Sequence, residues 1–138
     1  NYEKAYKEIK RILIKNGYIC LIWNHRNLNN LHQKEIEKII KHYLPNFSYG
    51  DRRYDYRKLL STNTSLKNIT RFSQRFSKNI DKKDFVNAWK SHGTLMRNCK
   101  SKNEFDKIIK KINNYINSLK KKTIKVPYDS VAYIARLK

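Results

Sequence analysis

The glycines of this chain constrain its fold more than any other feature of the sequence. There are only three in 138 residues, and they lie far apart, at Gly17, Gly50 and Gly93. A Gly-rich loop that holds a phosphate or a nucleotide needs at least two glycines within about six residues. Such a loop is therefore excluded, and with it every function in which this chain alone holds a nucleotide in that way.

The charge of the chain points to an anionic partner. There are 32 Lys and Arg residues against 11 acidic residues, so the formal net charge is +21. Nucleic acid is the first candidate for a partner of such a chain. A bias toward A/T-rich codons would also explain the abundant lysines, but it does not explain the scarcity of acidic residues. Both interpretations of the charge stay open at this point.

The rest of the composition predicts a single cytoplasmic domain without a membrane anchor. A length of 138 residues suits one domain, and a hydrophobic fraction of 39% is enough for a core. No apolar run approaches the roughly 18 residues of a membrane span, and the lysine-rich N-terminal segment does not resemble a signal peptide. Cys20 and Cys99 form no disulfide or metal-ligand spacing, so we expect a reducing, cytoplasmic compartment.

The first 23 residues predict a helix followed by a buried strand. Residues 2–16 carry apolar side chains three or four apart, with Asn1 as an N-cap and Gly17 as the C-terminal glycine. Residues 18–23 are continuously apolar, which favours a strand buried on both faces in a parallel sheet. A helix, a glycine and a buried strand form the second half of a βαβ unit. We therefore expect the chain to begin in the middle of a fold.

The remaining elements predict one α/β unit, residues 1–138, without a domain boundary. Asn30 and Gln33 resemble a capping box that opens a helix through Leu44, and Ser101 and Glu104 form a second one. Behind the second box, a five-turn apolar stripe extends from Phe105 to Leu119. The other expected elements are a strand over residues 69–76 anchored by Phe72 and Phe76, a helix over 81–90, and a final strand over 124–136 that is interrupted near Pro127. The spacing of Phe72 and Phe76 by four would also suit a helix over residues 69–76.

Two segments at the ends of the chain resemble class I S-adenosylmethionine-dependent methyltransferases. Residues 8–26 read EIKRILIKNGYICLIWNHR, similar to the helix that ends in Arg-x-Leu-Lys-x-Gly-Gly and to the fifth strand that follows it. In one group of small-molecule methyltransferases, that strand ends in Trp-Asn-x-Arg, as Trp23, Asn24 and Arg26 do here. Residues 126–136, VPYDSVAYIAR, look like the last strand of the same group. The match is weaker in the middle, where residues 89–92 resemble a helix end followed by a serine-bearing turn.

The resemblance implies a partial methyltransferase. The fold class would be α/β: the C-terminal half of a Rossmann-like class I methyltransferase sheet, with inserted helices. The Gly-x-Gly-x-Gly cofactor loop and the acidic residue that would hold the ribose have no counterpart here. S-adenosylmethionine would thus be bound mainly by a missing N-terminal half, and this chain would be inactive alone. The expected partners are a small-molecule acceptor and, across the free edge of the strand at residues 18–23, either a cofactor-binding half or a second copy.

The candidate substrate-binding residues follow from the same placement. Asn24, His25 and Arg26 come directly after a strand, at the end where ligands bind in open α/β sheets. An amide, an imidazole and a guanidinium could orient a polar or carboxylate-bearing acceptor, and a neutral His25 could take its proton. Ser91 and His92 could reach the same cleft. The alternative is that these are ordinary loop polars, with Ser91 and His92 in a helix-ending turn.

The alternative function is a basic nucleic-acid-binding domain without catalytic activity. Residues 49–58 interleave tyrosines with arginines, an arrangement that can stack bases and contact phosphates. The competing interpretation is a surface loop whose tyrosines pack inward while its two aspartates offset part of the charge. We expect Trp23 and Cys20 to lie in the core, and we find no metal site, because His32 and His42 fall on different faces of one helix.

Overall fold

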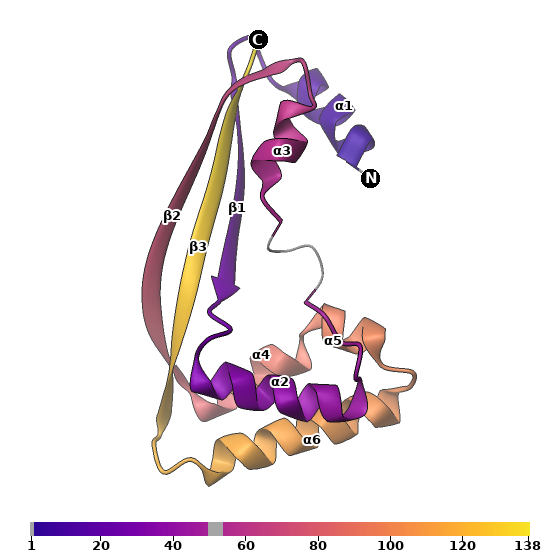
Figure 1. Cartoon of the computed structure of the whole chain (residues 1–138), viewed down its shortest axis with the longest axis vertical. Coiled ribbons are helices and arrows are strands. Elements are labelled where there is room, and N and C mark those ends of the chain that lie inside the picture. Colours follow the sequence, from indigo (N-terminus) through magenta and orange to yellow (C-terminus); the bar gives the residue numbers. More distant parts are fainter. Residues whose placement is uncertain (1, 50–53) are drawn as a thin grey trace. The chain divides into compact units, whose positions relative to one another are not determined.

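The computed structural model describes residues 2–49 and 54–138 and has a mixed α/β fold (Figure 1). The elements follow in this order: α1 (Tyr2–Ile12), β1 (Tyr18–Arg26), α2 (Leu31–Tyr43), α3 (Tyr56–Ser61), β2 (Leu66–Asp81), α4 (Lys82–Lys90), α5 (Gly93–Asn98), α6 (Lys102–Ser118) and β3 (Thr123–Leu137). The prediction of an α/β chain is confirmed at this level. None of the helices in the described part of the chain is both long and apolar enough to cross a lipid bilayer.

The three strands form one open sheet in the order β1-β3-β2. Leu137 donates its backbone N–H to Gly17 at one end of β1, and Asn27 donates to Pro127 at the other, so β1 and β3 are antiparallel. β2 is likewise antiparallel to β3, and β1 and β2 therefore run in the same direction (Figure 1). The parallel neighbour expected for β1 is thus wrong, and the described strands do not form a Rossmann-like half sheet. Local periodicity identified the strand but could not identify its neighbour.

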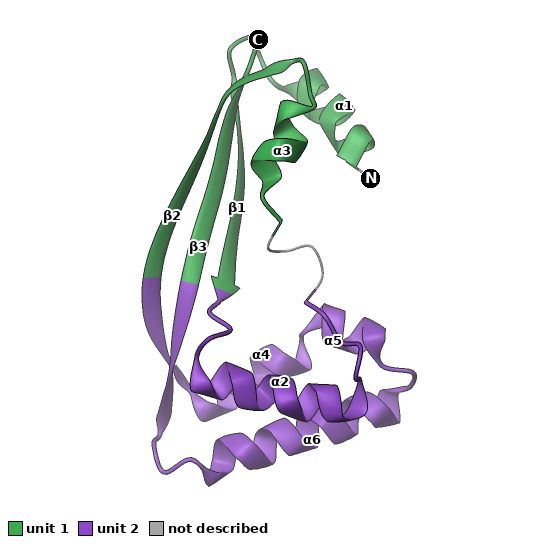
Figure 2. Cartoon of the chain, in the orientation of Figure 1, with its two compact units in different colours: residues 1–25, 52–75, 129–138 green, residues 26–51, 76–128 purple. Residues whose placement is uncertain are grey.

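Contacts divide the chain into two compact units, which are shown in Figure 2. Unit 1 comprises residues 1–25, 52–75 and 129–138, and unit 2 comprises residues 26–51 and 76–128. Each unit has its own apolar core. β2 and β3 each contribute residues to both units, and the expected single domain stays a prediction.

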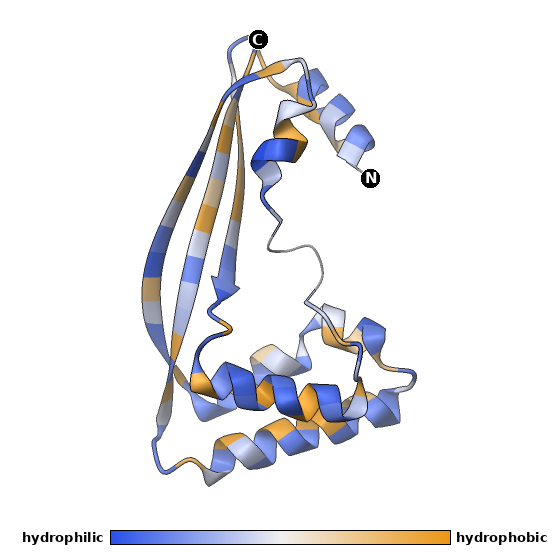
Figure 3. Ribbon diagram, viewed as in Figure 1, coloured by the Kyte–Doolittle hydropathy of each residue, from blue (hydrophilic) through white to orange (hydrophobic). Residues whose placement is uncertain are grey.

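The core of unit 1 lies on one face of the sheet. The buried members are Ile19, Tyr56, Leu60, Leu66, Val131, Tyr133, Ala135 and Leu137, and half-buried Tyr6, Ile9 and Leu13 of the first segment pack against them. In each strand these residues alternate with residues of the opposite face, as the pleat requires. Figure 3 shows the resulting bands of apolar and polar residues along the strands. Helices α1 and α3 therefore belong to this face.

The opposite face of the sheet in unit 1 carries exposed apolar side chains. Tyr18 and Ile22 of β1 are 62% and 65% exposed, and Phe72 of β2 is 56% exposed. Cys20 is also exposed. The predictions that residues 18–23 are buried on both faces, that Cys20 lies in the core and that Phe72 is an anchor are therefore wrong. The physical reason is that the described helices of unit 1 cover only one face.

A left-handed residue shifts the register of β2. Asn68 has a φ of 54°. Leu66 and Ile69 both pack into the core of unit 1, although they lie three apart, and a regular strand places only residues an even number apart on one face. We therefore assign a β-bulge at Asn68, whose extra residue moves the following odd-numbered residues onto the core face. The polar residues discussed below owe their orientation to this bulge.

The helices of unit 2 follow the sequence pattern closely. Helix α6 packs against α2, α4 and α5 and buries the predicted stripe of Phe105, Ile108, Ile109, Ile112 and Ile116. The Ser101 hydroxyl accepts from the Glu104 N–H at 3.2 Å, as expected for an N-cap. The Asn30 side chain caps α2 in the same way. Local capping and periodicity were sufficient here because both signals lie within one helix.

Pro127 does not interrupt β3. The carbonyl of Pro127 accepts from Asn27, just beyond the end of β1. In an antiparallel strand, the N and the C=O of one residue point to the same neighbour. The missing N–H of Pro127 therefore points toward Asn27, just beyond the end of β1, and not toward β2, so the pairing of β3 with β2 does not depend on it. The predicted interruption is wrong for this reason.

Candidate functional site

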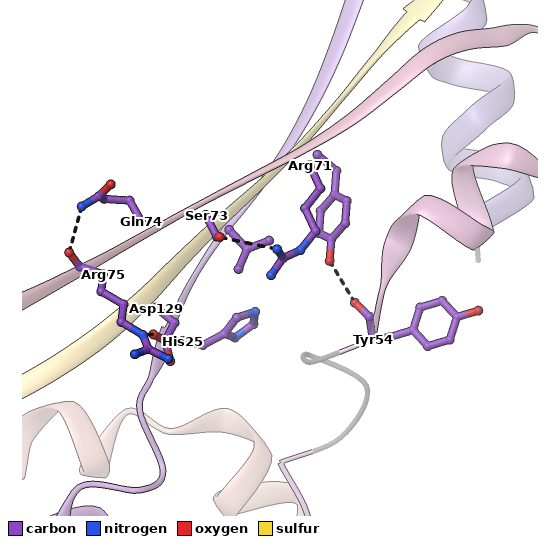
Figure 4. A pocket seen from close by; sticks show the side chains of 9 residues that line it. His25, Tyr54, Arg71, Ser73, Gln74, Arg75 and Asp129 are labelled. Atoms are coloured by element: carbon purple, nitrogen blue, oxygen red, sulfur yellow. Dashed lines mark hydrogen bonds and ion pairs between the residues drawn. The ribbon is translucent and has the colours of Figure 1, made fainter.

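A cavity of about 560 Å³ lies over the polar part of the core face of the sheet, within unit 1 (Figure 4). We call it the sheet pocket. The residues that line it come from all three strands and from the segment before α3: His25, Tyr54, Arg71, Ser73, Gln74, Arg75, Asp129, Val131 and Tyr133. Its volume falls in the range of small-molecule sites, which is about 300–1,000 Å³.

The register of the sheet explains why these side chains meet. Arg75 and Asp129 form an ion pair across β2 and β3 at 3.0 Å, so they lie opposite each other. Ser73 lies two residues before Arg75 in β2, and Arg71 lies two residues before Ser73, so all three side chains are on the same face of the strand. On the other side of β3, the pairing of β1 brings His25 level with Asp129. The sheet therefore aligns an imidazole, a carboxylate and two guanidinium groups.

The pocket has an excess of positive charge. Two arginines face one carboxylate among the lining residues of the described chain, and that carboxylate pairs with Arg75. Arg71 donates to the hydroxyl of Ser73 at a long 3.4 Å. The pKa of Asp55 falls to about 2, first because Arg57 donates hydrogen bonds to it, and in smaller part because of the charge of Arg71. The charge of Arg71 therefore contributes, as the smallest cause, to the lowered pKa of Asp55.

Apolar and aromatic groups complete the wall of the pocket. Val131 and Tyr133 are buried and present carbon surface from β3. The Tyr133 hydroxyl donates to the Tyr54 carbonyl at 3.4 Å, an interaction drawn in Figure 4. Tyr133 thus offers its ring to the pocket, since its hydroxyl already has an acceptor. A ligand with both a charged end and a carbon skeleton suits such a wall.

A second cluster, in unit 2, gathers around the buried indole of Trp89. The guanidinium carbon of Arg26 lies 4.7 Å from the centre of the Trp89 ring and 5.6 Å from that of Phe85. His92 stacks on the same indole at 5.0 Å, and its Nδ1 accepts from the Leu95 N–H at 3.1 Å. We call these residues the indole cluster. Cation–π contact and N-capping give Arg26 and His92 packing roles that do not require a ligand.

The five predicted substrate-binding residues thus have different positions. His25 lines the sheet pocket. Asn24 points to the opposite face, where its side-chain oxygen accepts from the Ser130 hydroxyl. Arg26 and His92 belong to the indole cluster, and the Ser91 hydroxyl donates to the Ala88 carbonyl at the end of α4. The structure brings Arg26 and His92 together on one indole, while Ser91 sits in the helix-ending turn.

Sequence reasoning missed Arg71, Ser73, Arg75 and Asp129. The sequence predicts a strand over residues 69–76, with its two phenylalanines as the apolar anchors. The alternation Arg71-Phe-Ser73-Gln-Arg75 was an available signal, since it places both arginines on one face of any strand. The opposing acid on β3 could not be found in the same way, because the pairing joins residues 54 positions apart.

Part of the tyrosine- and arginine-rich segment packs inward or is paired. Residues 50–53 of this segment lie outside the described part of the chain. Tyr56 is buried in the core of unit 1, where it stacks on Trp23 at 4.5 Å. Arg57 forms an ion pair with Asp55 at 2.5 Å. These contacts favour the interpretation of a loop whose tyrosine packs inward and whose aspartate offsets charge.

The described residues offer no evident site for a metal or for the expected cofactor. No group of three or more His, Cys, Asp or Glu side chains among them is arranged to hold a metal ion. The three glycines are too far apart for a loop that would hold S-adenosylmethionine. The described chain therefore does not fit that cofactor by itself.

The comparisons with known proteins identify no family for this chain. No protein-family model matches the sequence, and the search of curated proteins finds no match. The resemblance to methyltransferases therefore depends only on the residues quoted above.

Proposed function

We propose that this chain forms the acceptor-binding side of an S-adenosylmethionine-dependent methyltransferase that acts on a small molecule. The observation that carries the proposal is the position of His25. It directly follows the Trp23-Asn24 pair of the methyltransferase-like segment and lines a pocket that also contains two guanidinium groups. A residue from the resembling segment therefore lies where a small polar acceptor could be held.

The proposal gives the described residues two tasks. Arg71 and Arg75 would hold and orient the acceptor, because guanidinium groups bind oxyanions in a defined direction. His25, when neutral, would take the proton that the acceptor loses. The cofactor is assigned to another part of the protein or to another chain, since the described residues do not fit it. On this proposal the chain is inactive alone.

The uncovered face of the sheet supports association with such a cofactor-binding part. Tyr18 and Ile22 expose apolar surface on β1, and Phe72 exposes more on β2. β1 has one neighbour in the described sheet, so its other edge is open to a further strand. A second copy would add another charge of +21, and like charges oppose association. A less basic cofactor-binding part is therefore a better partner than a homodimer.

A methyl-transfer assay on the complete gene product tests the proposal. The gene is read upstream of Asn1, and the encoded protein is incubated with methyl-labelled S-adenosylmethionine and a panel of small carboxylates, alcohols and amines. We expect label in one acceptor class, and a loss of about 10²–10⁴-fold in kcat for His25→Ala. His42→Ala is the control, because His42 is exposed on α2, outside the sheet pocket.

Two results would overturn the proposal. The first is tight binding of S-adenosylmethionine to the 138-residue chain alone, measured by calorimetry. The second is a complete gene product that transfers no label to any acceptor class. Cytoplasmic localisation belongs to the same proposal and is tested by fractionating the source cells.

Nucleic-acid binding remains the second candidate, because the net charge of +21 favours polyanions. Titration with a labelled oligonucleotide at two salt concentrations separates the two functions. Micromolar affinity that falls steeply with salt would support the nucleic-acid candidate. Weak binding that does not depend on salt would rule out the nucleic-acid candidate.

A further inference from the structure

We infer that the sheet pocket binds a small organic oxyanion, a carboxylate or a phosphate ester, and that Arg71 is its principal ligand. This inference deepens the proposed function by naming the class of acceptor. Binding to the pocket can be measured without the cofactor, so the inference about the pocket and the proposed function can fail separately.

The charges of the pocket favour an anionic ligand. Asp129 is the one carboxylate among the lining residues of the described chain, and it is engaged by Arg75 at 3.0 Å. Arg71 forms no ion pair with a described lining residue, and the nearby Asp55, whose pKa its charge helps to lower, is already engaged by Arg57. A further anion entering the pocket would restore the balance of charge there. The Asp129 pair also holds Arg75 against β3, so that both guanidinium groups line one cavity.

The geometry around Arg71 leaves hydrogen-bond donors for a ligand. Its hydrogen bond in the described structure is to the Ser73 hydroxyl, at 3.4 Å and therefore weak. A guanidinium has five N–H donors in a planar fork, so most of them remain for a ligand. The Ser73 hydroxyl accepts from Arg71 and can donate its own hydrogen to the same anion. Figure 4 shows the Arg71 guanidinium and the His25 ring on the same side of the sheet.

The size and the wall of the pocket indicate a ligand with a carbon skeleton. A volume of about 560 Å³ is far larger than a bare phosphate or sulfate ion requires. Val131 and the ring of Tyr133 give part of the wall an apolar character. A ligand that fills the site would therefore have a carbon skeleton against β3 and an oxyanion at Arg71. This combination describes an organic acid or a phosphate ester.

The test is calorimetric titration of the 138-residue chain at low salt. The probes are succinate, phenyl phosphate and succinamide, the last being a neutral analogue of succinate. We expect one or both anions to bind and succinamide not to bind. A preference for succinate identifies a carboxylate site, and a preference for phenyl phosphate identifies a phosphate site.

Three arginine variants make the test specific. Arg71→Ala should weaken anion binding by at least about tenfold, because it removes a charge-assisted fork. Arg97→Ala is the matched control, since Arg97 is also exposed and its guanidinium also donates to a hydroxyl, that of Thr94 at 3.5 Å. Arg71→Lys should give an intermediate affinity, because the charge remains and the fork is lost. Arg71 lies on an exposed strand, so its variants should keep the urea midpoint of the parent.

The inference is overturned if neither anion binds at concentrations up to about 10 mM. It is also overturned if both alanine variants weaken binding equally, because the attraction would then come from the net charge alone. If anions bind at Arg71 while the complete gene product transfers no methyl group, the pocket assignment stands and the proposed function is wrong.

Discussion

Replacing Tyr56 is the most direct test of how unit 1 is held together. Tyr56 begins α3, is only 7% exposed, and contacts four aromatic side chains in the same unit. Its ring stacks on Trp23 at 4.5 Å and packs edge-on against Tyr133 at 5.8 Å. It therefore joins α3 to β1 and to β3 through one side chain.

The expected cost follows from these contacts. Truncating a buried aromatic ring to alanine costs about 3–5 kcal/mol, which includes about 1 kcal/mol for a stacked aromatic partner. For Tyr56→Ala we expect about 3–4 kcal/mol, because the site is at the edge of the core and can partly collapse. Tyr56→Phe keeps the ring. The hydroxyl that it removes lies 3.5 Å from that of Tyr2, so this variant should cost about 1 kcal/mol, the usual contribution of one hydrogen bond.

Urea unfolding followed by circular dichroism measures the difference. With a slope of about 1.5–2 kcal/mol per molar urea, Tyr56→Ala should lower the midpoint by about 2 M. NMR gives a local readout, since the indole N–H of Trp23 should shift when its stacked ring is removed. The reasoning is refuted if Tyr56→Ala and Tyr56→Phe share one midpoint and leave the Trp23 resonance unchanged.

Three further predictions follow from single side chains. Gly17→Ala should lower the free energy of unfolding by about 1–3 kcal/mol, because the added Cβ would lie 2.9 Å from the backbone oxygen of Ile14. Gly93→Ala should be tolerated, because the added Cβ would meet only the flexible guanidinium of Arg97, at 3.1 Å. Thermal denaturation of the two variants compares these effects. Gln33→Met should raise stability by about 1 kcal/mol in urea titrations, because Gln33 is buried and its amide makes no hydrogen bond within the described residues; an unchanged or lower stability would show that the amide is satisfied. The pKa of Asp55 is lowered from 3.8 to about 2 by Arg57, so the stabilisation from this pair is complete above pH 4 and is lost as the pH falls through 2. NMR titration of the Asp55 carboxyl should show this low pKa, and an ordinary value near 4 would contradict the ion pair.

The helices of unit 2 were predictable because their signals are local. The Ser101 cap and the apolar stripe behind it lie within one helix, and the structure confirms both. The same holds for Asn30 and α2. Trp89 was correctly placed on the inner face of its helix by its spacing from Phe85. Each of these predictions needed only residues three or four apart.

The sheet was predictable only in part, and the candidate site followed the sheet. Strand propensity located most of β1 and β3 but only residues 69–76 of β2, and the Trp23-Asn24 motif led to His25. The alternation in β2 could have placed Arg71 and Arg75 on one face, but not on the face that contains His25. That assignment depends on the bulge at Asn68 and on the pairing of β2 with β3.

The sequence by itself thus determined α2, α4 and α6, most of α1, the N-caps of α2 and α6, the approximate positions of the strands and the excess of positive charge, whereas it predicted neither α3 nor α5. Only the tertiary structure decided which strands are neighbours, which face of the sheet is covered and which polar side chains share a pocket. The physical reason is that hydrogen bonds between strands join residues far apart in the chain, as Arg75 and Asp129 show across 54 positions. Periodicity assigns alternate residues to two faces, but packing against α1 and α3 decides which of those faces becomes the core.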